Sequence, residues 1–128
     1  MTHYDGVKAE DFFEEFCNKN NLEFNRVHQP FDFLVNGKLV EVKSARLFVK
    51  QYRDGRKVQG RYECWRKSQL IKLKKRNPWV CFIVTSKNGC MIQGFTKARN
   101  WPAMMKISMK ETENIGLRSV KEFLRYIK

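Results

Sequence analysis

Two carboxylates and a lysine are brought close together by one predicted turn. Asn36 and Gly37 stand between two apolar-rich runs, and both residues tolerate the positive φ of a type I′ hairpin turn. With these residues in the turn, Asp32 lies opposite Glu41, and Lys43 shares the strand face of Glu41. Carboxylate oxygens are the ligands that hard divalent cations prefer, so this cluster indicates metal-ion chemistry beside a positioned lysine.

The predicted pairing of Asp32 with Glu41 has an electrostatic cost. Cross-strand partners have Cβ atoms about 4.5–5.5 Å apart, and like charges at that distance destabilise a sheet. A divalent cation bound between the two carboxylates would offset their repulsion. The alternative is a solvated hairpin face on which the charges repel weakly, but Phe33 and Val40 favour strands that are buried on both faces.

A third carboxylate is predicted on a helix that precedes the hairpin. The pattern predicts this helix from Asp5, as its cap, to about Asn20, with Phe residues at helical spacing on one face. Glu10 lies at the edge of that apolar face and is the acidic residue best placed to point inward. It would either join a metal site or stabilise the helix N-terminus by about 0.3–1 kcal/mol.

These residues, taken together, resemble the active-site motif of the PD-(D/E)XK nuclease superfamily. The matching positions, in chain order, are Gly6, Glu10, Asp32, Glu41, Val42 and Lys43. One extra residue separates Pro30 from Asp32, which departs slightly from the pattern in the motif's name. The resemblance covers about residues 6–95 and is closest to archaeal Holliday junction resolvases and their relatives.

The resemblance implies a restriction-endonuclease-like αβββαβ core and a metal-dependent endonuclease that hydrolyses DNA, with selectivity for branched structures such as Holliday junctions. Asp32, Glu41 and the main-chain carbonyl of Val42 would bind Mg²⁺, for which Mn²⁺ could substitute, while Glu10 completes or supports the shell. Lys43 would orient or deprotonate the attacking water or stabilise the transition state; it could also hold the acids together as an ion pair. The alternatives are a nickase or restriction-like enzyme with the same site, and a non-catalytic nucleic-acid-binding domain.

A second helix is predicted from Trp65 to Arg76, because Pro78 stops it. Trp65 and Leu73 are expected to face inward, and Gln69 lies between them on the same face. A buried amide needs a hydrogen-bond partner. Gln69 would either approach the metal site, as a helix glutamine does in related nucleases, or bind a backbone carbonyl.

The charge of the chain favours a nucleic-acid partner. It has 26 Lys and Arg against 13 Asp and Glu, a formal charge of +13 and a pI near 9.9. An anionic membrane would also attract such a chain, but the sequence shows no long apolar span and no N-terminal hydrophobic signal. The sequence therefore predicts a cytoplasmic protein that binds branched or duplex DNA and no membrane.

Most of the candidate phosphate contacts lie on a second predicted hairpin and on the helix after it. The hairpin joins residues 47–52 to residues 57–64 around Asp54-Gly55, and it interleaves basic and aromatic side chains. Its cations would track phosphates or, alternatively, protect a sheet edge from aggregation. The predicted contacts are Lys50, Arg53, Arg56, Lys57, Arg61, Arg66, Lys72 and Lys75.

The remaining patterns complete a single α/β domain, residues 1–128, with a mixed central sheet flanked by helices. The core spans about residues 6–95, with an extension over 96–128. The apolar run 79–85 predicts a strand covered on both faces, and Ser119 and Glu122 form a capping box for a last helix. Met104 and Met105 are candidates for a homodimer surface, which symmetric cutting of two strands would require.

Overall fold

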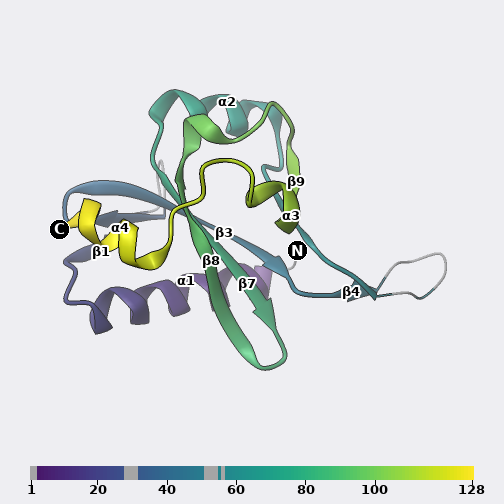
Figure 1. Ribbon diagram of the computed structural model, residues 1–128, viewed down its shortest axis with the longest axis horizontal. Helices are drawn as coiled ribbons and strands as arrows, with labels where there is room; N and C mark the ends of the chain where they lie inside the picture. The colour runs from purple at the N-terminus through teal and green to yellow at the C-terminus, as the bar shows by residue number, and fades with distance from the viewer. Residues whose placement is uncertain (1–2, 28–31, 51–54, 56) are drawn as a thin grey trace.

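A twisted five-stranded sheet forms the centre of the computed structural model, which describes residues 3–27, 32–50, 55 and 57–128 (Figure 1). The strand order is β1-β2-β3-β7-β8, with β3 parallel to β7 and the other neighbours antiparallel. The predicted mixed-sheet α/β domain is therefore confirmed. The strands are β1 (Phe24–Arg26), β2 (Phe33–Val35), β3 (Lys38–Arg46), β7 (Trp79–Ser86) and β8 (Gly89–Lys97).

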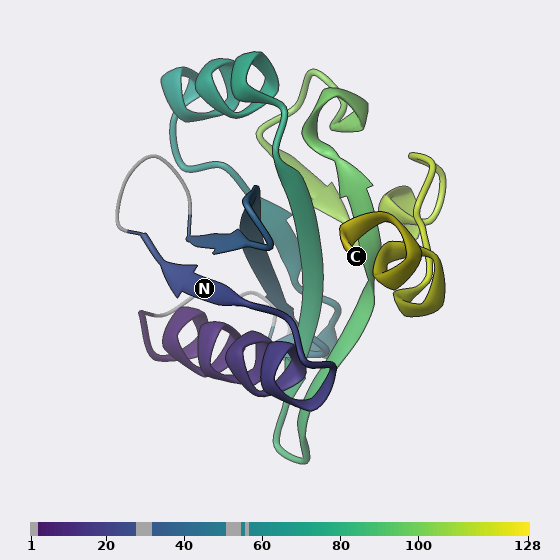
Figure 2. The ribbon, with the colours of Figure 1, turned by 90° about the vertical axis from the view of Figure 1, so that its left-hand side faces the viewer.

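Helices cover both faces of this sheet. They are α1 (His3–Lys19), α2 (Lys67–Arg76), α3 (Met109–Thr112) and α4 (Val120–Ile127), with a 3₁₀ turn, η1 (Ala98–Asn100). Alternate residues of β7 face opposite layers: Cys81 packs in a core cluster with α1 and α4, and Phe82 packs in a second cluster with α2. Figure 2 shows α1 and α2 at opposite ends of the view. Every residue of β7 except the last is buried, as predicted for a strand covered on both faces.

The Asn36-Gly37 hairpin forms as predicted. The two turn residues have positive φ angles of 46° and 81°, and Phe33 lies opposite Val40 in the expected register. The Asn36 side chain accepts a hydrogen bond from the Glu23 amide at 2.9 Å, which ties β1 to the turn. The local turn signal was sufficient here because the two strands are adjacent in sequence and joined by a two-residue turn.

The second hairpin is shorter than predicted. β4 (Val49–Lys50) and β5 (Lys57–Val58) pair as an arm that projects from the sheet in Figure 1. The expectation that the second strand continues to Cys64 is wrong, because β6 (Arg61–Glu63) pairs instead with β9 (Lys106–Ser108). Gly60 makes this separation possible, since its amide donates to the Arg46 carbonyl at 2.8 Å and returns the chain to β3.

The first turn of the predicted 65–76 helix is not helical. The helix begins at Lys67, and Trp65, which was expected to face inward, is 68% exposed. Leu70 and Leu73 are buried as predicted. The first helix also differs at its start, because α1 begins at His3, two residues before the predicted cap.

Residues 96–128 contribute to the core. The Ser119 hydroxyl accepts from the Glu122 amide at 3.2 Å and starts α4 as predicted. The Phe123 ring stacks on Phe95 with centroids 3.8 Å apart, and both are fully buried. No helix in the described part of the chain is long and apolar enough to span a membrane.

Candidate active site

The first candidate carboxylate lies where β2 and β3 separate. The ladder between the two strands ends at Phe33 opposite Val40, so the predicted strand pairing of Asp32 with Glu41 does not form. The Asp32 Oδ2 atom accepts a hydrogen bond from the Val42 amide at 2.8 Å. The Asp32 carbonyl accepts from the Val27 amide at 2.9 Å, so hydrogen bonds fix both its backbone and its side chain.

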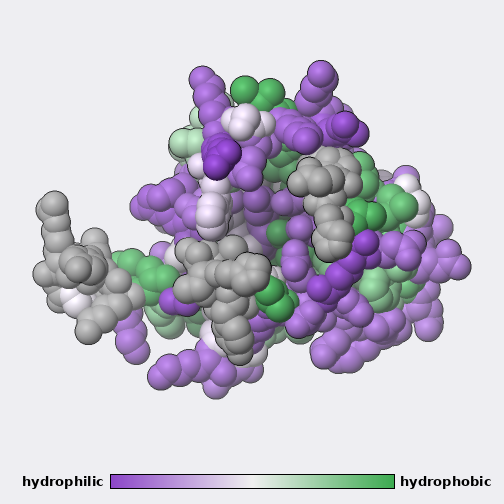
Figure 3. Space-filling view, turned by 180° about the vertical axis from the view of Figure 1, so that it is seen from behind, coloured by the Kyte–Doolittle hydropathy of each residue, from purple (hydrophilic) through white to green (hydrophobic). Residues whose placement is uncertain are grey.

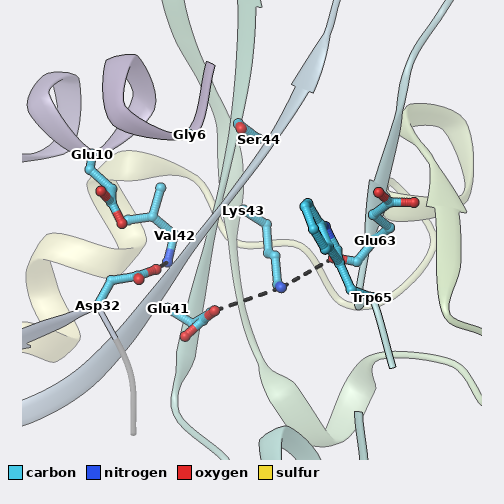
Figure 4. Close-up of a pocket in the computed structure, with 9 residues that line it drawn as sticks. All are labelled: Gly6, Glu10, Asp32, Glu41, Val42, Lys43, Ser44, Glu63 and Trp65. Atoms are coloured by element: carbon cyan, nitrogen blue, oxygen red, sulfur yellow. Dashed lines mark hydrogen bonds and ion pairs between the residues drawn. The ribbon is translucent and has the colours of Figure 1, made fainter. Parts of the chain in front are cut away.

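A small pocket opens beside this separation. The carboxyl groups of Glu10, Asp32 and Glu41 line it together with Lys43 (Figure 4). Gly6, Val42, Ser44, Glu63 and Trp65 make up the rest of the wall. Figure 4 shows Glu10 and Asp32 on one side of β3 and Trp65 on the other. The structure thus brings together the four side chains that the sequence predicted as the centre of the site.

α1 supplies Glu10 from the layer that covers one face of the sheet. Ala9 and Phe13 are buried against the sheet, which turns the edge of the helix toward the end of β2. Gly6, one turn before Glu10, also lines the pocket and adds no side chain to its volume. Glu10 is partly buried, and its carboxyl group makes a hydrogen bond with that of Asp32.

Glu41 and Lys43 lie on the same face of β3, as their period-two spacing requires. The Lys43 Nζ atom is 3.7 Å from Glu41 Oε1 and donates to the Glu63 carbonyl at 3.1 Å. The Glu41 and Lys43 side chains are only 17% and 18% exposed. The ammonium group is therefore held between β3 and β6, where it can reach the pocket but is largely shielded from bulk water.

Burial and the charge of Asp32 raise the pKa of the two glutamates in the pocket. Burial, followed by the negative charge of Asp32, raises the pKa of Glu10 to about 7 and that of Glu41 to about 8. Burial also raises the pKa of Asp32, although the hydrogen bond from Val42 opposes this shift. The positive charge of Lys43 lowers the pKa of Glu41 without cancelling the effect of burial. The positive charge near the cluster is therefore too small to keep all three carboxyl groups ionised, and the cluster retains protons near neutral pH.

The donor set suits a hard divalent cation. Three carboxyl groups line the pocket, and the Val42 carbonyl is a fourth oxygen donor, of a second type. The N–H and C=O of a strand residue point to the same side, so the Val42 carbonyl faces the edge at which its amide meets Asp32. Among the described residues, no three His, Cys, Asp or Glu side chains form a ready-made metal cage, so the carboxyl oxygens would have to converge on the ion.

Gln69 lies apart from this cluster. It is exposed and does not line the pocket, so the expectation that it faces inward is corrected. Its Oε1 atom accepts from the amides of Trp65 and Arg66, at 2.9 and 3.3 Å. Arg66 is the N-cap residue of α2, so its amide has no partner within the helix, and Trp65 directly precedes it. The amide therefore caps α2, a role that the predicted helix start at Trp65 concealed.

The predicted phosphate contacts are exposed wherever the structure describes their side chains. Arg53 and Arg56 lie outside the described residues, as does the side chain of Lys50. The exposed cations are Lys57, Arg61, Arg66, Lys72 and Lys75. The face of the molecule seen from behind the view of Figure 1 is largely hydrophilic (Figure 3).

Ser44, Glu63 and Trp65 also line the pocket but were not predicted as site residues. Glu63 and Trp65 could have been found from the period-two alternation of the segment, because they alternate with the buried residues Tyr62 and Cys64. The tryptophan thus stands at the rim of the pocket with its ring exposed. Ser44 is buried, and only the three-dimensional pocket reveals it.

Comparisons of the chain with protein-family models, curated proteins and solved structures find no match.

Proposed function

We propose that this chain is a metal-dependent endonuclease of the PD-(D/E)XK type that hydrolyses phosphodiester bonds in DNA. The observation that carries the proposal is the gathering of Glu10, Asp32, Glu41 and Lys43 in one pocket at the edge of β3. These residues come from α1, from the end of β2 and from β3, and share a site only because β2 separates from β3. A structural ion pair would need one carboxylate for Lys43, whereas this pocket holds three.

The carboxylates of Asp32 and Glu41, with the Val42 carbonyl, would hold Mg²⁺, and Mn²⁺ fits the same oxygen donors. When bound, the ion lowers the pKa of water and neutralises charge on the scissile phosphate. Glu10 would complete the donor set or hold Asp32 in place through the hydrogen bond between their carboxyl groups. Asp32 is itself oriented by the Val42 amide.

Lys43 would position the attacking water and stabilise the reacting phosphate. Its ammonium group donates one proton to the Glu63 carbonyl and forms an ion pair with Glu41 at 3.7 Å, which is too long for a hydrogen bond. A further proton can therefore be donated to a water molecule or a phosphate oxygen. A cation held in a shielded pocket stabilises developing negative charge more strongly than one in open water.

Branched DNA is the proposed substrate, in keeping with the resemblance to junction resolvases. Trp65 adds an exposed ring at the rim of the pocket, where an unpaired base beside the scissile bond could stack. Two active sites in a homodimer would cut two strands symmetrically.

The test is cleavage of labelled duplex, single-stranded, flapped and four-way-junction DNA, with Mg²⁺ or with EDTA. We expect Asp32→Asn and Glu41→Gln to lose at least about a hundredfold in rate while DNA affinity stays within about twofold. Asp32→Asn keeps an oxygen for the Val42 amide, so its fold should be intact. Glu15→Gln, on the exposed side of α1, is the matched control.

Paired cuts on the junction would support a resolvase. Cleavage of another DNA form would keep the nuclease but assign it a different substrate. Wild-type rates in Asp32→Asn would refute the proposed site. Tight binding without any cleavage by the wild type would favour a non-catalytic binding domain.

A further inference from the structure

A second, positively charged pocket lies at the end of the sheet beside α4. It has a volume of about 380 Å³ and shares no residue with the acidic pocket. Its cations come from four separate segments: Lys38 from the start of β3, Lys97 from the end of β8, Arg99 from η1, and Arg118 from the segment before α4. None of the residues that line it in the described part of the chain is acidic.

Contacts within the fold hold these cations in place. β7 and β8 pair with Lys97 opposite Trp79, and the Lys97 Nζ atom lies 5.4 Å from the centre of the indole ring. The Arg118 guanidinium lies 5.3 Å from the centre of the Tyr126 ring. The backbone amide of Arg99 donates to the Asn77 side chain at 2.8 Å. Ring contacts therefore hold the Lys97 and Arg118 side chains beside the pocket, while for Arg99 the hydrogen bond fixes the backbone.

The pocket has an excess of positive charge that the protein only partly offsets. Glu122 pairs with Arg118 at 3.3 Å, but it does not line the pocket. Burial lowers the pKa of Lys97, and the nearby charges of Lys38 and Arg99 lower it further. An anion in the pocket would relieve this repulsion.

The walls of the pocket favour a nucleotide over a bare anion. Two aromatic rings line the pocket: Trp79 is 8% exposed and Tyr126 is 54% exposed. Cations beside an exposed aromatic ring are the combination that binds a phosphate and its attached base. We propose that this pocket binds the phosphate of a nucleotide within a nucleic-acid strand. The inference rests on the proposed function only in taking nucleic acid as the ligand, because the pocket takes no part in cleavage.

The test compares two variants that remove the same amount of charge. Lys97→Gln/Arg99→Gln removes two cations from the pocket, whereas Lys110→Gln/Lys121→Gln removes two exposed cations that do not line it. Binding of a labelled single-stranded oligonucleotide is measured by fluorescence anisotropy at several salt concentrations, with EDTA present throughout. Each phosphate contact on a single strand contributes about 0.7 to the slope of log K against log salt. We expect the pocket variant to lower this slope by about 1.4 and the control variant to leave it unchanged.

A free nucleotide is the other source of the same phosphate chemistry. Adenosine monophosphate is therefore titrated into the wild type and both variants. If binding of the mononucleotide depends on Lys97 and Arg99, but the salt slope for the oligonucleotide does not, the pocket binds a free nucleotide and the proposal is wrong. Equal slopes in the two double variants, with no binding of the mononucleotide, would also overturn it.

Two further controls keep the result interpretable. Arg118 is left unchanged because it pairs with Glu122, and urea unfolding of both double variants checks that they fold. If the pocket variant does not fold, Lys38→Gln at the exposed start of β3 should lower the slope by about 0.7. Because these experiments contain EDTA, their outcome is independent of whether the wild type cleaves DNA with Mg²⁺.

Discussion

The protonation of the acidic pocket follows from where three carboxyl groups sit relative to one lysine. Lys43 is close enough to Glu41 to form an ion pair, but Glu10 and Asp32 lie together on the other side of β3. One ammonium group cannot neutralise three carboxylates in a partly buried pocket. In the metal-free protein, the carboxyl groups therefore either keep protons or repel one another as carboxylates. The pH determines which of these two states is populated.

We expect the metal-free protein to lose stability as pH rises. The folded-state pKa of Glu41, about 8, lies above its ordinary value of 4.5. The stabilisation that this proton gives is thus fully present below about 4.5 and is lost as pH rises through 8. At pH values above 8, Glu41→Gln should be more stable than the wild type by a few kcal/mol, because each pKa unit of the rise from 4.5 to about 8 corresponds to about 1.4 kcal/mol.

Urea unfolding in EDTA across this pH range measures the effect. Glu15→Gln, whose side chain is exposed on α1, should follow the wild-type pH dependence. A wild-type protein that gained stability between the two pKa values, relative to Glu41→Gln, would contradict the proposed protonation.

The sequence predicted the central residues of the site because local rules place them. The hairpin turn brings Asp32 near Glu41, although the strands separate before the two residues pair, strand periodicity adds Lys43, and helical periodicity turns Glu10 inward. The prediction for Gln69 was wrong because the role of this residue depends on where α2 begins, and helix starts are the least certain part of a prediction from sequence. Its amide was assigned to the pocket when it was needed as a cap.

At the scale of elements, pairing between distant segments was the part that sequence did not predict. The turn at Asn36-Gly37 and the buried strand β7 follow from local signals, and both are confirmed. The pairing of β6 with β9 joins segments more than forty residues apart, as in Tyr62 opposite Ile107, and no turn signal marks it. It matters for the site because β6 carries the Glu63 carbonyl that holds Lys43.

Gly60 is the point at which β6 is attached to β3. A Cβ atom at this position would lie 2.8 Å from the backbone oxygen of Arg46 and 3.0 Å from its nitrogen. Because backbone atoms cannot turn away, we expect Gly60→Ala to destabilise the fold by about 1–3 kcal/mol. It should also slow cleavage, since Glu63 would move away from Lys43.

Thermal unfolding and the junction-cleavage assay measure these two effects. The neighbouring variant Gln59→Ala, at an exposed position, should change neither. Unchanged stability in Gly60→Ala would mean that the contact between β3 and β6 is looser than described.

The last helix is a structural part of the domain. Phe123 fills the space between Phe95 and Trp79, with ring centroids 3.8 and 5.4 Å away. Phe123→Ala should therefore cost about 3–5 kcal/mol of unfolding free energy, which urea titration would measure. Phe48→Ala, at a ring that is 57% exposed, should cost far less. Equal losses in the two variants would show that α4 is not packed on the sheet.

Across the whole molecule, positive charge is present at two places that differ in construction. The cations near the arm and on α2 are exposed and separate, whereas those of the second pocket converge on one cavity. The net charge of +13 predicted nucleic-acid binding, but only the fold distinguishes dispersed, exposed cations from cations that line one pocket. Composition records how many charges there are and gives no information about which segments meet.

Junction cutting in pairs would require a two-fold assembly, and the predicted surface for it is exposed. Met104 and Met105 are 42% and 45% exposed, between η1 and β9. Met104→Glu/Met105→Glu should therefore convert a dimer to a monomer and paired cuts to single nicks. Analytical ultracentrifugation and the junction assay measure the two outcomes, with Ile71→Glu as a control at another exposed apolar residue. A double variant that remained dimeric would place the interface elsewhere.

The position of Trp65 also gives the protein a built-in optical reporter. Of the three tryptophans, Trp79 and Trp101 are buried, at 8% and 1% exposure, while Trp65 is 68% exposed at the rim of the acidic pocket. Water around an indole shifts its emission to longer wavelength, so the red edge of the fluorescence spectrum belongs mainly to Trp65. Collisional quenching by acrylamide should act on this component first. An oligonucleotide that covers the rim should protect it, which makes occupancy of the pocket visible without a label.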